Sequence, residues 1–151
     1  MEIELYGNHL KLENNEIYKY KKNKGGNYWY KIKFTLNNKG YLNCSLFNNK
    51  VGRLFKFHRL IYYFYNQEWD IFNQELIIDH INRNTLDNSI DNLRVVTKQE
   101  NNFNTDAKGC YFHKGKWIAE ITINRKKKYL GYFLTEEEAH NAYLQAKKEY
   151  H

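Results

Sequence analysis

Four polar side chains between residues 79 and 101 have the chemistry that phosphodiester hydrolysis needs. Asp79 and His80 are adjacent at the end of an apolar run, Asn92 follows 13 residues after the acid, and Asn101 another 9 residues on. Histidine is the usual general base for activating water. The oxygens of Asp79 and Asn101 suit one hard divalent cation, Mg²⁺ or Mn²⁺. The set therefore predicts a one-metal site that leaves coordination positions open for phosphate and water.

Neighbouring residues of a strand point to opposite faces, so Asp79 and His80 can serve one site only if the strand ends there. The side-chain amide of Asn92 is well placed to bridge the loop and to fix the backbone around His80. An Asp-His pair at a strand end is more often a turn with a surface histidine. The ordered set of four residues favours the functional interpretation.

The elements that must position these residues are predicted in the order strand, loop, strand, helix. Residues 76–80 and 93–96 are the strands, and 81–91 the polar loop. Thr97 and Glu100 have capping-box spacing, which predicts a helix over about 98–104. Upstream, the apolar side chains of 58–65 form one helical stripe and predict a short helix.

Residues 40–104 resemble an HNH homing endonuclease of the phage and intron-encoded type. The matching residues are Gly40-Tyr41, Leu46-Phe47, Phe57-His58-Arg59-Leu60-Ile61, Asp79-His80, Asp91-Asn92-Leu93-Arg94-Val95-Val96-Thr97 and Glu100-Asn101. The resemblance implies a ββα-metal nuclease core at 58–104, with His80 as general base and Asn92 orienting the loop. It also implies Asp79 and Asn101 as ligands of a divalent ion. Asn101 stands where many such motifs have histidine, which favours a lightly held hard metal.

Two residues next to this motif have alternative interpretations. Arg59 is a candidate phosphate contact or a structural residue, and His58 is expected mainly to pack beneath the site. Residues 1–57 are predicted to form a small antiparallel sheet that contacts DNA through a basic face. Its strands include 28–34, a return strand at 41–47 and a third at 54–57, with turns at 37–40 and 48–50.

The C-terminal part is predicted to be a separate unit at 105–151, after a polar linker at 102–108. Three strands (109–113, 116–124 and 127–133) precede a helix capped by Thr135, whose first turn is acidic. Residues 108–148 resemble the plant ethylene-response-factor (Apetala-type) DNA-binding domain. The matching residues are Lys108-Gly109, Lys116-Trp117-Ile118-Ala119-Glu120-Ile121, Tyr129-Leu130-Gly131-Tyr132-Phe133, Thr135-Glu136-Glu137-Glu138-Ala139 and Ala142-Tyr143.

This second resemblance implies that the open face of the three-stranded sheet enters the major groove of DNA. By position it implicates Lys108, Tyr111, His113, Glu120, Thr122, Lys127 and Tyr129. The turn adds a predicted phosphate clamp made of Arg125, Lys126, Lys127 and Lys128, for which a solvated basic turn is the alternative. The plant domains are richer in Arg and Trp, so a different sequence preference is expected.

The whole chain is predicted to be an α+β protein: an N-terminal antiparallel sheet, a central ββα-metal core, and a three-stranded sheet packed on one helix. The formal charge of +7 favours a polyanionic partner. The two cysteines lie far apart, so neither a zinc site nor a disulfide framework is expected. No run approaches a membrane span and no leader opens the chain, which favours a cytoplasmic protein that is not secreted.

The leading hypothesis is a site-specific homing endonuclease that acts on double-stranded DNA as a monomer, without a protein partner or a membrane. One active centre makes one cut, so nicking is expected; a double-strand cut would need dimerisation or a second strike. One alternative is a non-catalytic DNA-binding regulator with a vestigial nuclease core. Another is an RNA-binding protein, because 17% of the residues are aromatic.

Overall fold

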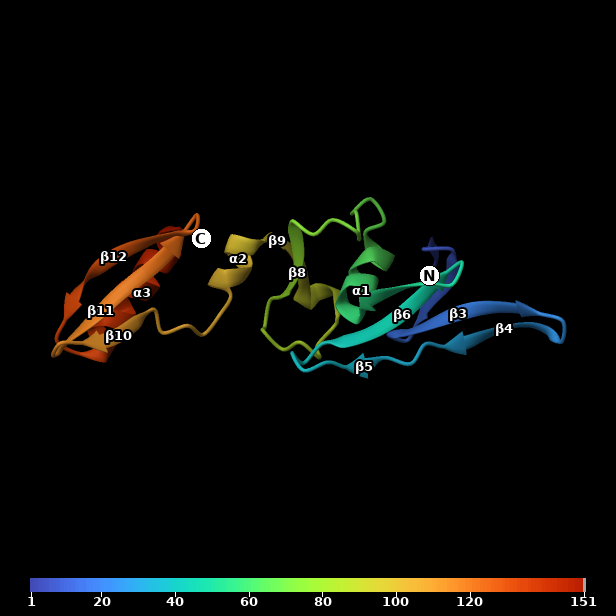
Figure 1. The fold of residues 1–151 in the computed structure, drawn as a ribbon, viewed down its shortest axis with the longest axis horizontal. Coiled ribbons are helices and arrows are strands. Elements are labelled where there is room, and N and C mark those ends of the chain that lie inside the picture. Colours follow the sequence, from blue (N-terminus) through green and yellow to red (C-terminus); the bar gives the residue numbers. More distant parts are fainter. Residues whose placement is uncertain (151) are drawn as a thin grey trace. The chain divides into compact units, whose positions relative to one another are not determined.

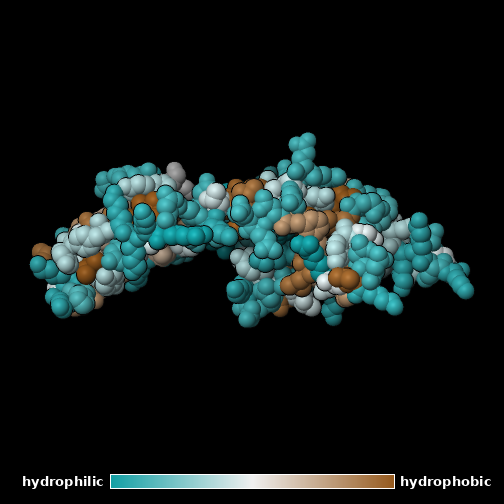
Figure 2. All heavy atoms as spheres, turned by 45° about the horizontal axis from the view of Figure 1, so that its top comes forward, coloured by the Kyte–Doolittle hydropathy of each residue, from teal (hydrophilic) through white to brown (hydrophobic). Residues whose placement is uncertain are grey.

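The computed structural model describes residues 1–150, which form a sheet-rich protein with few helices and several small antiparallel sheets (Figure 1). The chain divides into two compact units, Met1–Val95 and Val96–His151. Hydrophilic side chains cover most of the face seen in Figure 2, and apolar ones appear there in scattered patches. Within residues 1–150, no helix has both the length and the apolar character needed to span a bilayer.

The first unit begins with a four-stranded antiparallel meander. Its strands are β1 (Glu2–Leu5), β2 (Asn8–Glu13), β3 (Glu16–Asn23) and β4 (Gly26–Lys31). The inward side chains of β1 and β2, such as Leu5 and Leu10, are buried and belong to one large apolar core. The exposed ends of β3 and β4 extend beyond this core and carry lysine and tyrosine.

A second sheet contains β5 (Thr35–Leu36), β6 (Leu42–Asn48) and β7 (Val51–Lys56). The predicted turn at 48–50 is confirmed. The predicted strand 28–34 ends early, because β4 stops at Lys31 and residues 32–34 belong to no strand. The N-terminal part of the chain therefore holds two sheets, where the sequence predicted one. The sequence analysis did not separate β1, β2 and β3, although the loops between them contain glycine and asparagine.

Tight hairpin turns explain much of this arrangement. Five hairpins have two-residue loops in which both residues have positive φ, the signature of the type I′ turn that matches strand twist. The loops are Tyr6-Gly7, Asn14-Asn15, Asn49-Lys50, Lys114-Gly115 and Asn124-Arg125. Asparagine tolerates this backbone region better than most residues, so the asparagine-rich composition supports the strand pairing directly.

Helix α1 (Phe57–Tyr65) follows β7 immediately and confirms the predicted helix. Its buried face consists of His58, Leu60, Ile61 and Phe64, which joins the apolar core of the first unit. Strands β8 (Leu76–His80) and β9 (Leu93–Thr97) then pair in a two-stranded sheet. The loop between them ends in a short 3₁₀ helix, η1 (Ile90–Asn92).

The second unit begins within β9 and contains α2 (Lys98–Phe103) with a complete capping box, as predicted. Strands β10 (Cys110–His113), β11 (Lys116–Ile123) and β12 (Lys126–Phe133) form its antiparallel sheet. Helix α3 (Glu136–Glu149) packs on that sheet and is capped by Thr135 and Glu138. Cross-strand pairing puts Ile121 on the helix-facing side, where it packs with Tyr143 and Ala146.

The polar segment 102–108 is not a simple linker. Asn102 and Phe103 are the last residues of α2, and Phe103 is only 4% exposed. Its ring packs with Ile121, Tyr143 and Ala146 in the core of the second unit. A single aromatic residue in a polar stretch has no periodicity, so the sequence pattern did not reveal that the helix is anchored to this core.

Two glycines of the second unit make a matched test of its packing. Gly109 has φ +65°, and a Cβ there would lie 2.0 Å from the ring of Tyr143, which is buried. Gly115 has φ +82° but open space around it. We expect Gly109→Ala to lower the unfolding free energy by about 3 kcal/mol, the sum of backbone strain and overpacking. Gly115→Ala should cost about 1 kcal/mol. Urea unfolding of both variants measures the difference, and equal losses would contradict the packing.

Candidate active site

Strand β8 ends at His80 and the chain turns at once. The amide of Arg83 donates to the carbonyl of His80 at 2.9 Å, and Arg83 has φ +63°. Asp79 and His80 are both buried, at 8% and 3% exposure. The abrupt strand end that the sequence required for Asp79 and His80 to serve one site is therefore present.

Asn92 holds the loop that follows. Its Oδ1 accepts from the amide of Asn82 at 2.9 Å, and its Nδ2 donates to Asn82 Oδ1 at 2.9 Å and to the carbonyl of Asp87 at 2.7 Å. The backbone adds a bond from the amide of Ile81 to the carbonyl of Asn92. The side-chain amide thus bridges both ends of the loop, which is the geometry expected of a loop-orienting residue; its part in chemistry stays a prediction.

The orientation of His80 follows from its neighbour Asn88. The Nδ2 of Asn88 donates to the carbonyl of Leu86 at 3.0 Å, which leaves its Oδ1 facing His80 Nε2 at 3.1 Å. With the amide in this orientation, a proton on Nε2 makes the contact a hydrogen bond from His80 to Asn88 Oδ1.

Aromatic rings pack around His80. The ring of His58 meets it edge to face at a centroid distance of 4.9 Å, and Tyr41 lies 5.2 Å from His58 and 6.1 Å from His80. Lys56 places its Nζ 4.6 Å from the centre of the Tyr41 ring. The packing supports the structural interpretation of His58, because it lies behind His80 in the core of the unit.

His58 is held in the neutral form. Burial lowers its pKa to about 3, and the nearby charges of His80, Lys56 and Arg59 act in the same direction. A neutral His58 adds no positive charge beside His80.

Asp79 is paired with a cation from the next strand. Its Oδ2 accepts from Arg94 Nε at 3.1 Å and lies 3.0 Å from a terminal guanidinium nitrogen of the same residue. Arg94 is part of the sequence motif, yet no role was predicted for it. The opposite charges of Asp79 and Arg94 on two predicted strands could have suggested this ion pair. The sequence did not show which residues of 76–80 and 93–97 lie opposite each other.

A buried carboxylate is a suitable ligand for a hard divalent cation, so Asp79 fits the metal that the sequence predicts. The second predicted ligand, Asn101, is on α2 and belongs to the second unit. Its approach to Asp79 and His80 therefore stays a prediction. Within residues 1–150, no group of three or more His, Cys, Asp or Glu side chains is arranged to hold a metal.

Arg59 has contacts that give it a structural role. Its guanidinium donates to the carbonyls of Ile71 at 2.6 Å, Asn73 at 2.9 Å and Leu76 at 3.4 Å. It also lies over the ring of Trp69. These contacts tie the segment before β8 to α1, and the predicted phosphate contact of Arg59 stays untested.

In the second unit, the predicted DNA-contacting residues fall into separate groups. Cross-strand pairing places Tyr111, Glu120, Thr122, Lys127 and Tyr129 on the sheet face away from α3. Glu120 is the centre of this group, since it accepts from the Tyr111 hydroxyl at 3.2 Å and from Lys127 at 3.4 Å. The ion pair between Glu120 and Lys127 therefore partly neutralises the charge of this face.

The predicted phosphate clamp is divided by the alternation of the strand. Arg125 is in the turn, and Lys127 pairs with Thr122 on the open face. Lys126 and Lys128 pair with Ile123 and Ile121 and so lie on the helix-facing side, where Lys128 donates to the Tyr150 hydroxyl. Two further residues that were predicted to contact DNA lie away from this turn. Lys108 forms an ion pair with Glu136, and His113 on β10 is paired with Lys116 on β11.

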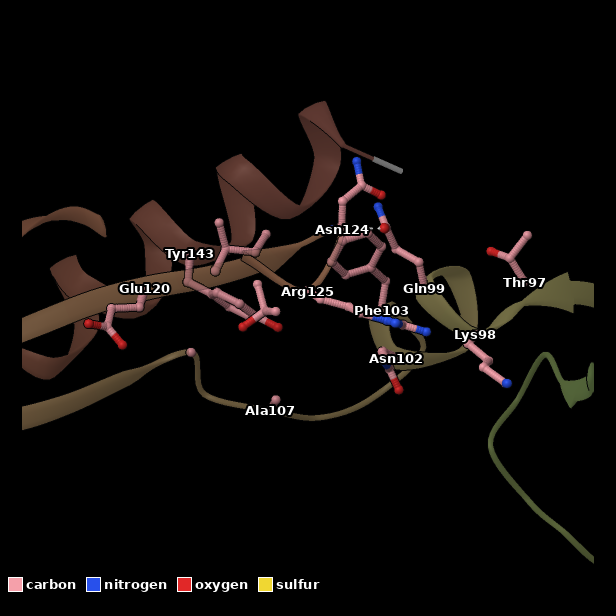
Figure 3. A pocket seen from close by; sticks show the side chains of 13 residues that line it. Thr97, Lys98, Gln99, Asn102, Phe103, Ala107, Glu120, Asn124, Arg125 and Tyr143 are labelled. Carbon is pink, nitrogen blue, oxygen red and sulfur yellow. Dashed lines mark hydrogen bonds between the residues drawn. The ribbon is translucent and has the colours of Figure 1, made fainter. Parts of the chain in front are cut away.

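A groove of about 750 Å³ in the second unit was not predicted from the sequence (Figure 3). It lies between α2 and the end of β11, with Phe103 and Tyr143 in its wall and Lys98 and Arg125 among its polar residues. Gln99 accepts from the amide of Asn124 at 3.0 Å and joins the two elements there. The cationic residues place positive charge beside the turn of the predicted clamp.

Removal of the Asn92 amide tests its hold on the loop. Asn92→Ala should lower the unfolding free energy by about 2–3 kcal/mol, because three hydrogen bonds of about 1 kcal/mol each are lost. The amide of Asn82 should also exchange its hydrogen faster. The matched control is Asn84→Ala in the same loop, an exposed residue whose side chain accepts from Leu86 and whose loss should cost within about 0.5 kcal/mol. Equal effects of the two substitutions would contradict the bridging role.

The depressed pKa of His58 predicts a pH dependence of stability. Below about pH 6.5 the unfolded chain binds a proton at this residue while the folded chain does not, so stability falls as pH falls toward 3. From pH 7 to pH 5 the loss due to His58 should be about 2 kcal/mol. In His58→Phe, which keeps a ring and removes the titration, the loss should be smaller by that amount. Urea unfolding of both proteins at the two pH values measures it, and identical pH profiles would count against a neutral buried His58.

In a comparison with known protein families, the central segment of the chain gives a match. Residues 55–103 match the family model described as HNH endonuclease. A solved structure of DNA binding and cleavage by the HNH homing endonuclease I-HmuI is 22% identical, with a TM-score of 0.49; the match covers 81% of this chain and 70% of that chain. No curated protein matches the chain.

Proposed function

We propose that the protein is a metal-dependent DNA endonuclease that hydrolyses phosphodiester bonds in double-stranded DNA. The observation that carries this proposal is the orientation of His80 within the segment that matches the HNH family model. The contact of Asn88 Oδ1 with His80 Nε2 supports the Nε2–H tautomer, in which Nδ1 would act as the base. The alternative, a surface histidine in an ordinary turn, does not account for a ring that is 3% exposed and held by a side-chain contact.

In the proposed mechanism, His80 Nδ1 removes a proton from the attacking water. The ring edge of His58 and the amide of Asn88 keep the imidazole from rotating during this transfer. Asn92 contributes indirectly, because it holds the loop that carries Asn88. The three residues together keep the base in one position relative to the bound DNA strand.

The metal in this proposal would be held by Asp79 and Asn101. A bound Mg²⁺ or Mn²⁺ would supply neutralisation of charge at the phosphorus and stabilisation of the leaving 3′ oxygen. Asp79 supplies a carboxylate at the end of β8, and Asn101 a neutral oxygen from α2. Two protein ligands leave the remaining positions to DNA and water.

DNA would be held by both units. The N-terminal sheets offer exposed lysines on β3, and the second unit offers the open face of β10–β12, which supports an Apetala-type DNA-binding module. Weak contacts from segments that precede and follow the nuclease core in the sequence would give a long, mismatch-tolerant target, as a homing enzyme needs. One active centre per chain favours nicking by a monomer.

His80→Ala should reduce cleavage by at least about 10²-fold and leave DNA binding unchanged. The assay follows conversion of supercoiled plasmids that carry fragments of the source genome, with and without Mg²⁺, while a gel shift measures binding. His140→Ala is the matched control, since this histidine lies on α3 and bonds the carbonyl of Lys108. Undiminished cleavage by His80→Ala would refute its role as base. DNA binding without cleavage by the unmodified protein would favour the non-catalytic regulator.

A further inference from the structure

The contact between Arg94 and Asp79 uses a single carboxylate oxygen. Two of the three guanidinium nitrogens of Arg94, Nε at 3.1 Å and Nη2 at 3.0 Å, approach Asp79 Oδ2. The carboxylate side chain is 9% exposed, whereas the arginine side chain is 37% exposed. One partner of the pair is thus buried in the first unit, and the other reaches the solvent.

A divalent cation bound to Asp79 Oδ2 would compete with this guanidinium for one atom. A hard cation binds carboxylate oxygens at about 2.0–2.6 Å, which is too close to leave two N–H donors in place on the same atom. The two positive groups would also repel each other at that separation. Binding of a metal to Asp79 Oδ2 therefore requires Arg94 to move.

We propose that Arg94 is an internal counterion of Asp79 that a divalent metal and a DNA phosphate displace together. The inference rests on the proposed function, because it takes Asp79 as a metal ligand. Without DNA, Arg94 satisfies the buried carboxylate and keeps the affinity for metal low. With DNA, a backbone phosphate provides the guanidinium with a new partner and releases the carboxylate.

The chemistry of Arg94 suits this exchange. A guanidinium binds phosphate oxygens with the same planar fork that it offers to a carboxylate, so it changes partner without losing its hydrogen bonds. Its partial exposure lets it reach a ligand that Asp79 cannot reach. Because coupling between two ligands is reciprocal, DNA should raise metal affinity by the factor by which metal raises DNA affinity.

Titration of Mn²⁺ into the full chain, followed by electron paramagnetic resonance of the free ion, tests the inference without reference to activity. We expect Arg94→Gln to bind Mn²⁺ at least about 10-fold more tightly than the unmodified protein when no DNA is present. Arg53→Gln is the matched control, because it removes the same charge from an arginine that lies over the ring of Phe72. Asp79→Asn should lose the binding site in either background.

A second titration adds a DNA duplex, in a His80→Ala background so that the DNA stays uncut. DNA should tighten Mn²⁺ binding when Arg94 is present and change it little in Arg94→Gln. Melting curves check that the variants fold. If Arg94→Gln does not fold, Arg94→Lys replaces it. The lysine keeps the positive charge but lacks the two-pronged guanidinium, so we expect it to tighten Mn²⁺ binding a few-fold.

The outcomes separate the inference from the proposed function. If Asp79→Asn abolishes Mn²⁺ binding but Arg94→Gln, or its Lys substitute, does not tighten it, the counterion role is refuted while the nuclease proposal stands. If Asp79→Asn leaves Mn²⁺ binding unchanged, the metal-ligand assignment fails and the inference fails with it. Equal tightening by DNA with and without Arg94 would refute the exchange with phosphate.

Discussion

Buried polar side chains must find partners inside the protein, and this constraint shapes the region around His80. Asp79, His80, Asn88 and Asn92 are all at most 8% exposed. Asn88 and Asp87 in the loop and Arg94 on β9 are among their partners, and the loop side chains Ile81 and Leu86 are exposed. Ile78 and Leu93 anchor the two adjoining strands in the core of the first unit. The site is therefore a network of polar side chains next to strands that are packed into the apolar core.

Local signals in the sequence were sufficient where a few neighbouring residues determine the structure. The cap of α2 at Thr97 and that of α3 at Thr135 could be predicted, because a capping box is complete within four residues. The helix at 57–65 was visible from its apolar stripe. Phe103 was missed because burial of one aromatic residue depends on a core formed by Ile121 and Tyr143, far along the chain.

The candidate site was predictable to the same extent. The order and spacing of Asp79, His80 and Asn92 pointed to the loop that the structure displays, and the bridging amide followed from position. The partners Arg94 and Asn88 were not assigned, because their contacts arise from cross-strand pairing and from a side-chain orientation within the loop. The division of Lys126 from Lys127 follows from the two-residue period of a strand and was available from the sequence.

The anchoring of α2 has a consequence for how such a chain could be recombined. The segment that matches the HNH family model extends through Phe103, whereas the compact second unit starts at Val96. If C-terminal modules were exchanged at residue 104, Phe103 would stay behind and lose its packing partners, so its ring would be exposed to water. The transferred module would lack the aromatic ring that completes its core. The unit that can be exchanged between proteins is therefore larger than the three-stranded sheet with α3. A viable crossover point would have to transfer α2 together with it.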